Sequence, residues 1–289
     1  MHHIRTEHVA HQRHVPNAPD GVPPAFVQAS RYCDAASEPV RDAAADITRG
    51  ARTDRDRAVR VFHWTRDEIR YVVGIHRHRA SETLRLRAGS CSNKANLMAA
   101  MLRSIGIPSG FHVHRVRTRE YFGPLCSDRF KVFVSHESNH VSGCVLLGGR
   151  WLEADPTDDR MLSERTVHLS PQSRLVAFGG DDHARLHIEP GHLVRRSEHP
   201  SPDIDRMLEK RRRTAPQVLA VFNLYLEHCR MHAHKHQSVR SVQDSFFVWL
   251  REQRPALHAA FVASEAWQRW RLRLRDPAAQ QNDRSMHDR

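Results

Sequence analysis

Apolar residues recur at helical spacing in the early part of the chain, and this pattern predicts two helices. Residues 38–48 form a short pattern that stops at Gly50. Thr53 is a suitable N-cap for the next helix, because its hydroxyl can accept a hydrogen bond from a free backbone N–H of the first turn. The helix is predicted to end near 71–74. Its buried stripe consists of Ala58, Val61, Phe62, Thr65 and Ile69.

A Gly-Ser turn precedes Cys91, and a further helical pattern begins at that cysteine. After this helix the period of the apolar residues changes to two, which predicts a strand over 111–116. Two more apolar runs, 140–147 and 150–155, flank a Gly-Gly pair, which is typical of a hairpin with a tight turn. The middle of the chain therefore predicts an antiparallel sheet next to a helix that starts with a cysteine.

Long helical stripes dominate the sequence beyond residue 200. We predict helices over 203–213, from Pro216, from Ser241 and from Pro255, and a strand earlier at 186–188. The chain thus divides into a polar N-terminal segment, an α+β domain, a basic helical extension and a disordered tail. The boundaries are 1–30, 31–200, 201–276 and 277–289.

Composition narrows the classes of protein. The five cysteines are scattered with no CxxC pair, which argues against a disulfide framework or a zinc ribbon. The histidines within 1–14 lack acidic or thiolate partners at ligand spacing, so we interpret them as part of a disordered segment. No apolar run is long enough to span a bilayer and no secretory signal is visible. We expect a reduced, cytoplasmic protein that does not enter a membrane.

A cysteine in the first turn of a helix can become a nucleophile. Free N–H groups and the helix dipole stabilise a thiolate there, and an imidazole is needed to take the proton. If the Gly-Gly pair forms a two-residue turn, Leu147 pairs with Arg150 and His140 lies opposite Thr157. Asp155 is then a diagonal neighbour of His140 at about 7–8 Å between Cα atoms. The other four cysteines are interpreted as small buried residues.

Four segments of the chain resemble the transglutaminase-like superfamily, which has a papain-like arrangement of Cys, His and Asp. They keep this order and the short separation between the His and the Asp, and the resemblance covers roughly residues 50 to 160. One departure is Ser142-Gly143, where family members often carry an aromatic residue soon after the histidine. The segments are 89–95, 102–108, 140–147 and 149–157.

The resemblance implies that Cys91 is the nucleophile, His140 the general base and acid, and Asp155 the residue that orients the histidine. It also implies an α+β fold in which the Cys helix packs on an antiparallel sheet. The sequence leaves His136 as a competing base, and we favour His140 because it lies close to Asp155 across the short turn.

Several further residues are candidates for the site. The backbone N–H of Cys91 would supply one oxyanion donor, and Trp64, Tyr71 and Ser81 are guesses for the second. Asn93 and Lys94 lie beside the nucleophile in the first turn of the helix, where Asn93 either positions substrate or lies on the helix surface. His136 and Tyr71 complete the substrate-binding candidates. His112 and His114 alternate on a predicted strand and are interpreted as structural histidines.

The formal net charge is +12, and residues 201–289 contain 16 Arg and Lys against 10 Asp and Glu. This balance favours an acidic partner, such as a carrier protein, coenzyme A or RNA, for the helical extension, although a solvated basic face explains it as well. The sequence contains no zinc finger, RNP-like segment or stacking array, which argues against sequence-specific nucleic-acid binding.

These observations predict a cysteine enzyme that cleaves or forms amide bonds, or transfers an acyl group, through a Cys91 acyl-enzyme. Its substrate would be a peptide, a protein side chain or a small molecule that contains an amide or acyl group. We expect no metal or redox cofactor, because this chemistry needs none. Calcium dependence is not supported, because no Asp/Glu-rich calcium loop is visible. Two alternatives remain: an acyltransferase of a biosynthetic pathway with a carrier-bound donor, and a non-catalytic binding protein.

Overall fold

The computed structural model describes most of the chain between residue 18 and residue 268. The histidine-rich start, Cys126, the basic run 210–213 and the tail 277–289 lie outside the described residues, so the predictions for them stay predictions. For Glu120 and Tyr121 only the backbone is described. The described ranges are 18–121, 130, 134–169, 174–209, 215–264 and 267–268.

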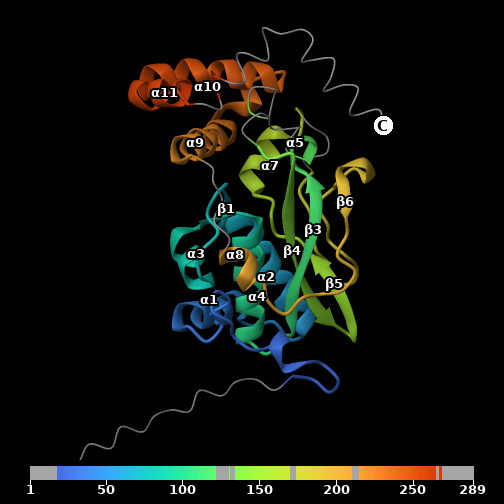
Figure 1. The fold of residues 1–289 in the computed structure, drawn as a ribbon. Helices are drawn as coiled ribbons and strands as arrows, with labels where there is room; N and C mark the ends of the chain where they lie inside the picture. The colour runs from blue at the N-terminus through green and yellow to red at the C-terminus, as the bar shows by residue number, and fades with distance from the viewer. Residues whose placement is uncertain are drawn as a thin grey trace, which may run out of the picture.

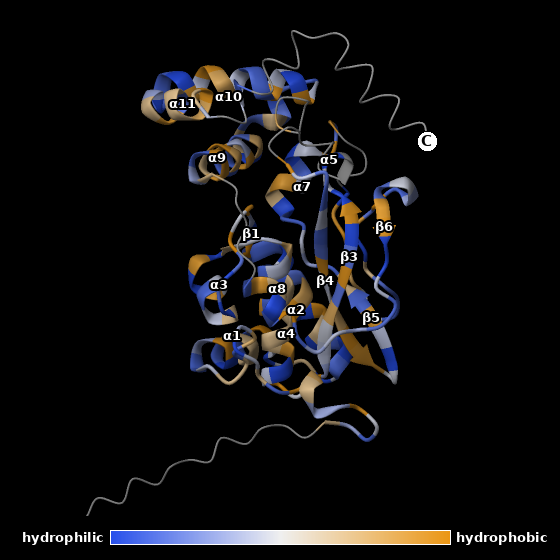
Figure 2. Cartoon of the chain, in the orientation of Figure 1, coloured by the Kyte–Doolittle hydropathy of each residue, from blue (hydrophilic) through white to orange (hydrophobic). Residues whose placement is uncertain are grey.

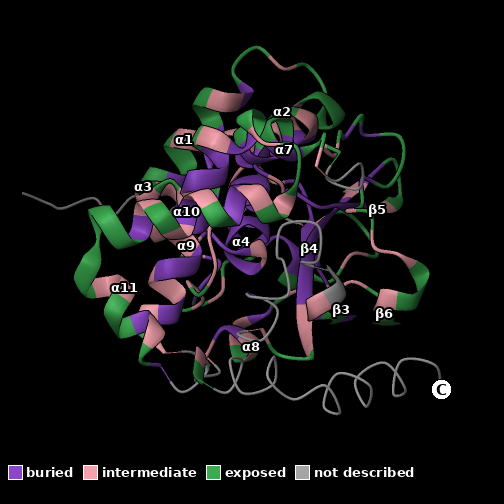
Figure 3. Ribbon diagram, turned by 90° about the horizontal axis from the view of Figure 1, so that it is seen from above, coloured by how far each residue is buried: buried purple, intermediate pink, exposed green. Residues whose placement is uncertain are grey.

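Helix α4 (Cys91–Ser104) lies at the centre of the molecule, and every residue from Ser92 to Arg103 is buried (Figure 3). Helices α1 (Glu38–Thr48), α2 (Asp54–Glu68) and α3 (Ala80–Leu86) pack against it on one side (Figure 1). The predicted N-cap is confirmed, because the Thr53 side chain accepts a hydrogen bond from the backbone N–H of Asp56 at 3.0 Å.

A four-stranded antiparallel sheet covers the other side of α4. Gly143 lies where β4 crosses the helix, and a Cβ atom there would stand 2.2 Å from the Cε atom of Met98. A larger residue would displace this methyl group and would also lie 3.1 Å from the Ala154 carbonyl oxygen, so glycine suits the close approach of strand and helix. The sheet order is β5 (Arg150–Ala154), β4 (Glu137–Leu147), β3 (Ser109–Arg117) and β6 (Leu193–Arg195).

The predicted hairpin and its register are confirmed. Leu147 pairs with Arg150, and Gly148 and Gly149 have φ angles of 55° and 76°. Such angles favour glycine and suit a two-residue turn between twisted strands. The ladder ends at Ala154, so Asp155 stands just beyond the paired residues.

The C-terminal helices form a second apolar cluster (Figure 2). Helices α9 (Pro216–His232), α10 (Val239–Gln253) and α11 (Pro255–Val262) pack on one another around Phe222, Phe246 and other aromatic side chains. The 3-10 helix η3 (Ala233–Lys235) follows α9 directly. Within the described ranges, no helix is both long enough and apolar enough to cross a membrane.

Short elements complete the architecture. Strands β1 (Arg70–Tyr71) and β2 (Ala88–Gly89) form a separate parallel pair. The others are η1 (Pro24–Phe26), α5 (Thr118–Tyr121), α7 (Arg160–Thr166), η2 (Pro190–His192) and α8 (Asp205–Glu209). The predicted fold class is confirmed: an α+β core with a Cys-initiated helix on an antiparallel sheet, followed by a helical extension.

Three sequence predictions are wrong in detail. Helix α2 ends at Glu68 because the next residues pair with β2, so strand pairing overrides the helical period. Residues 186–188 form no strand, and β6 occupies the edge of β3 instead. Helix α10 begins at Val239, since Ser238 rather than Ser241 is the residue whose side chain caps it.

Candidate active site

Cys91 is the first residue of α4, and Ser90 is its N-cap. The Asn93 side chain holds this turn, because its Oδ1 atom accepts hydrogen bonds from the backbone N–H of Ser90 at 3.3 Å and from the Ser90 hydroxyl at 2.8 Å. A Cβ atom on Gly89 would lie 2.8 Å from Cβ of Asn93, so the turn requires glycine. The local sequence therefore fixes a half-buried thiol at the positive end of a long buried helix.

His140 and Asp155 form a hydrogen-bonded pair across the end of the hairpin. The Nε2 atom of His140 lies 2.6 Å from Oδ2 of Asp155, and each side chain is only 2% exposed. The other carboxylate oxygen accepts from the backbone N–H of Thr157 at 3.0 Å, and the Asp155 N–H donates to Ala184 at 2.8 Å. The carboxylate is thus held from both sides.

The remaining side of the His140 ring faces Cys91, with which it forms a hydrogen bond, and the backbone N–H of Val141 also contacts the sulfur. Burial would raise the pKa of Cys91, but His140 and then Val141 outweigh it, so the pKa of Cys91 is lowered. Burial would lower the pKa of His140, but Asp155 and then Cys91 raise it well above its usual value. Both directions favour a thiolate beside an imidazolium.

The other described cysteines have the opposite character. Cys33, Cys144 and Cys229 are all buried. Burial raises the pKa of Cys33 to about 11 and the pKa of Cys229 to about 12, and it raises the pKa of Cys144 as well. Cys91 is therefore the one described cysteine with the properties of a nucleophile.

The segment 155–159, which we call the strap, carries Asp155 into α7 and is clamped by Lys94. The Lys94 ammonium donates to the carbonyl oxygens of Arg66, Ile69 and Asp158 at 3.1, 2.5 and 2.6 Å. Burial lowers the pKa of Lys94 to about 7. The alternative that placed Asn93 on the helix surface is wrong, because its side chain is fully buried, as is that of Lys94.

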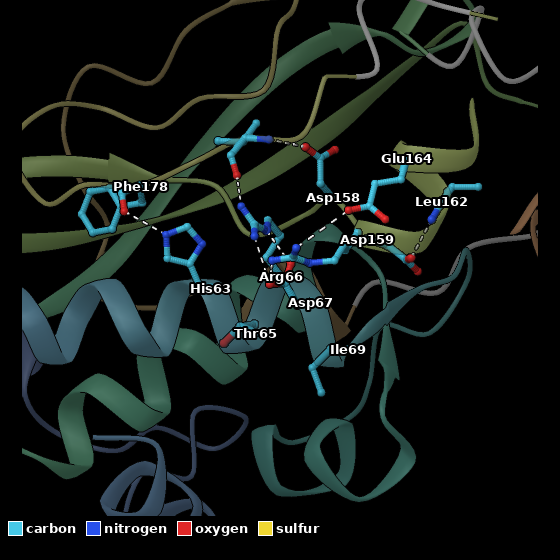
Figure 4. Close-up of polar contacts among 12 residues, drawn as sticks. His63, Thr65, Arg66, Asp67, Ile69, Asp158, Asp159, Leu162, Glu164 and Phe178 are labelled. Atoms are coloured by element: carbon cyan, nitrogen blue, oxygen red, sulfur yellow. Dashed lines mark hydrogen bonds and ion pairs between the residues drawn. The ribbon is translucent and has the colours of Figure 1, made fainter. Parts of the chain in front are cut away.

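The half-buried side chain of Asp158 belongs to a cluster of polar contacts (Figure 4). Its carboxylate accepts a hydrogen bond from the backbone N–H of Val176 at 3.0 Å. Arg66 donates a hydrogen bond to the carbonyl oxygen of Val176 at 2.5 Å. Burial raises the pKa of Asp158 to about 6. Asp67 joins this cluster through hydrogen bonds of 2.6 Å to Arg66 and to Arg160.

Asp159 links the strap to the C-terminal helices. Its Oδ1 atom caps α7 at Leu162, and its Oδ2 atom accepts from the Tyr71 N–H at 2.9 Å and from Arg230 of α9 at 2.7 and 2.9 Å. Arg230 also donates to the Tyr71 carbonyl at 2.6 Å, and its side chain is 2% exposed. This charge pairing across elements could not be inferred from local sequence patterns.

A second histidine–carboxylate pair lies beside His140. His114 stands directly opposite His140 on β3, with ring centroids 6.4 Å apart. Its Nε2 atom lies 2.6 Å from Oε1 of Glu153, and the Ser142 hydroxyl donates to the same oxygen at 2.6 Å. The interpretation of His114 as a structural histidine agrees with these internal contacts. Glu153 was missed, because nothing in its local sequence marks it.

The remaining candidates make contacts outside the Cys91–His140–Asp155 chain. His136 is exposed beyond the end of β4. The backbone of Tyr71 is bound to Asp159 and Arg230, the Ser81 side chain donates to Asp34, and Trp64 is covered by the Arg87 guanidinium. The second oxyanion donor stays unassigned. Among the described residues, no three His, Cys, Asp or Glu side chains converge as a metal site requires.

Comparison with known proteins places this geometry in context. A solved structure described as a "Putative Cysteine Protease from Cytophaga hutchinsonii" shares 20% identity, with a TM-score of 0.36. The similarity covers 46% of this chain and 40% of that chain, so less than half of either protein is compared. The search of curated proteins finds no match. Residues 41–156 match the transglutaminase-like superfamily, which confirms the resemblance for the segment that holds Cys91, His140 and Asp155.

Proposed function

We propose that the protein is a cysteine-dependent enzyme that cleaves or forms amide bonds, or transfers an acyl group, through an acyl-enzyme on Cys91. The observation that carries the proposal is the continuous hydrogen-bonded chain from Cys91 through His140 to Asp155, with the sulfur at a helix N-terminus. The thiol has an imidazole that can take its proton, and the imidazole has a carboxylate that orients it.

In the first half-reaction the Cys91 thiolate attacks the carbonyl carbon of the acyl donor. The negative charge that develops on the carbonyl oxygen is stabilised by the Cys91 backbone N–H, which has no acceptor within the helix. The His140 imidazolium then gives its proton to the leaving nitrogen as the C–N bond breaks. The products are an amine and a thioester on Cys91.

In the second half-reaction His140 is neutral and acts as the base. It takes a proton from water or from an acceptor amine, which attacks the thioester carbon and releases the Cys91 thiolate. Water gives hydrolysis and an amine gives a new amide bond. Asp155 keeps Nε2 of His140 protonated, so that Nδ1 is the nitrogen that faces sulfur and substrate.

Selective alkylation tests the nucleophile. At about pH 6 an ordinary thiol is almost entirely protonated, whereas a thiolate paired with an imidazolium still reacts. Iodoacetamide should therefore modify Cys91 first, as detected by peptide mass mapping. Slow labelling spread over all five cysteines would contradict the proposal and favour a non-catalytic binding protein.

The base is tested with a matched pair of variants. His140→Ala should abolish selective labelling at about pH 6, and His136→Ala should leave it intact. Both changes remove an imidazole, and the residues lie four positions apart on one chain segment. If His136→Ala removes the selectivity instead, the assignment of the base is wrong.

The fate of the acyl group is a separate question. Intact-mass analysis of protein incubated with cell extract would detect an acyl adduct on Cys91 and give its mass. Adding hydroxylamine to acylated protein would then show how an amine competes with water. Hydroxamate as the main product would support transfer, and free acid as the main product would support hydrolysis.

A further inference from the structure

A cavity of about 410 Å³, wide open to solvent, lies in the C-terminal helices and is lined by none of the residues proposed for catalysis. Its walls come from α9, from η3 with the residue after it, and from α10. This volume lies within the range typical of small-molecule sites. The polar lining residues are His228, His232, Lys235, His236, Ser245 and Glu252.

The α9 wall of the cavity is polar, and the α10 wall carries Val248 and Trp249 together with Ser245 and Glu252. On the polar side, the rings of His228 and His232 lie one helical turn apart with centroids at 4.7 Å, and Nε2 of His228 lies 2.9 Å from the Ser245 hydroxyl. On the other side, Val248 and the indole of Trp249 complete the lining, with the indole 6.1 Å from the His228 ring. An aromatic face beside several donors suits a ligand with a polar head and a flat body.

Among the described residues, Lys235 is the one lysine or arginine that lines this cavity. Burial, followed by the charges of His232 and His236, lowers the pKa of His228 to about 4, so this ring is neutral at pH 7. Glu252 is the one acidic residue among those that line it.

Further basic groups stand behind the rim. The His168 ring nitrogen lies 2.9 Å from the His236 carbonyl oxygen. Arg165 and Lys235 both act on the nearby His234 as positive charges. An anion would relieve the repulsion within this group, whereas a metal cation would add to it.

We propose that this cavity binds a phosphate monoester that carries a flat apolar group. The phosphate would accept hydrogen bonds from the histidine rings and from Lys235, and the flat group would lie against Trp249. A phosphate has three terminal oxygens and up to two negative charges, which matches several convergent donors better than a carboxylate does.

Titration calorimetry of the full-length protein with phenyl phosphate tests the proposal. We expect saturable binding, and tighter binding of phenyl phosphate than of inorganic phosphate because only the former has a ring for Trp249. Equal affinity for the two probes, or no saturable binding, would overturn the proposal. Cys91→Ala should bind as the wild type does, so the result does not depend on the proposed catalytic function.

Two charge-matched variants separate a built site from general attraction to a basic protein. Lys235→Gln should weaken phenyl phosphate binding about fivefold or more. Arg240→Gln removes the same charge from an 82% exposed side chain on α10 outside the cavity, and should change binding less than about twofold. Equal losses in both variants would overturn the proposal, as would Zn²⁺ binding that displaces phenyl phosphate.

Discussion

The His140–Asp155 pair and the His114–Glu153 pair lie on one sheet with the two histidines directly opposite each other. Both have a nitrogen–oxygen distance of 2.6 Å, and all four side chains are at most 5% exposed. The two rings are nearly parallel, with an angle of 17° between their planes. By distance and burial alone, either pair resembles the base of a catalytic triad.

The difference lies in the second ring nitrogen. On His114, Nδ1 accepts a hydrogen bond from the backbone N–H of Ser197 at 3.1 Å, so both nitrogens are bound inside the protein. The nearby Ser142 hydroxyl donates to Glu153 and is fully buried. On His140 the second nitrogen faces the half-buried Cys91. A histidine–carboxylate pair therefore becomes a base only where its other nitrogen meets a nucleophile that substrate can reach.

The largest effect should come from removing the thiol next to His140, compared with removing the hydroxyl next to His114. Cys91→Ala should reduce acylation by p-nitrophenyl acetate roughly 10⁴-fold or more, because the attacking atom is lost. Ser142→Ala should retain acylation within about threefold, as measured by p-nitrophenolate release. Activity that follows Ser142 rather than Cys91 would reverse the comparison.

The next largest effect should come from the two carboxylates. Asp155→Asn removes the charge that raises the pKa of His140, so the thiolate–imidazolium pair weakens. The rate of Cys91 alkylation should fall about 10- to 100-fold at pH 6 and much less at pH 8.5, where an ordinary thiol also ionises. Glu153→Gln is the matched control, and an equal loss in that variant would show that the two carboxylates act together.

Removing His114 should lower the stability of the protein without lowering the reactivity of Cys91, in contrast to removing His140. Removing its ring by His114→Ala leaves the buried Glu153 carboxylate without one partner, which should cost about 2–3 kcal/mol of unfolding free energy. Urea denaturation measures this loss. Cys91 alkylation of the folded variant should match the wild type, and a large drop would mean that His114 supports the reaction.

The smallest effect should be a change in the pH dependence of stability. Burial acts to raise the pKa of Glu153, but His114, Ser142 and Arg185 outweigh it and hold the pKa well below the usual 4.5. The stabilisation is therefore complete above pH 4.5 and is lost as pH falls toward the lower pKa of the folded protein. Denaturation of Glu153→Gln below pH 4.5 should show a shallower decline. A decline equal to the wild type would contradict this reading of Glu153.

The site could be predicted where residues close in sequence determine its geometry. The Gly-Gly turn fixes the register of the hairpin, and the register brings His140 next to Asp155. The Gly-Ser turn likewise fixes the start of α4 at Cys91. In these places the pattern of residues and the backbone geometry are local, so the sequence alone was sufficient.

The environment of Lys94 could not be predicted, because α4 is covered on all sides and its polar residues are buried like its apolar ones. The partners of Lys94 are carbonyl groups at the end of α2 and in the strap, which no helical period reveals. The partners of Glu153 likewise come from β3 and from the segment around Arg185. Such contacts depend on tertiary packing rather than on local pattern.

The ion pair between Asp159 and Arg230 crosses the predicted boundary at residue 200, which limits how the two parts of the chain can be recombined. The carboxylate belongs to the core and its buried arginine belongs to α9, so each part of the chain carries half of one ion pair. Exchanging the C-terminal helices for those of another protein would leave the buried Asp159 carboxylate without its arginine. An unpaired buried charge costs far more folding free energy than the loss of an exposed ion pair. A chimera must therefore keep an arginine at the position of Arg230 or replace Asp159 at the same time, and thermal denaturation of the single and paired exchanges would measure this dependence.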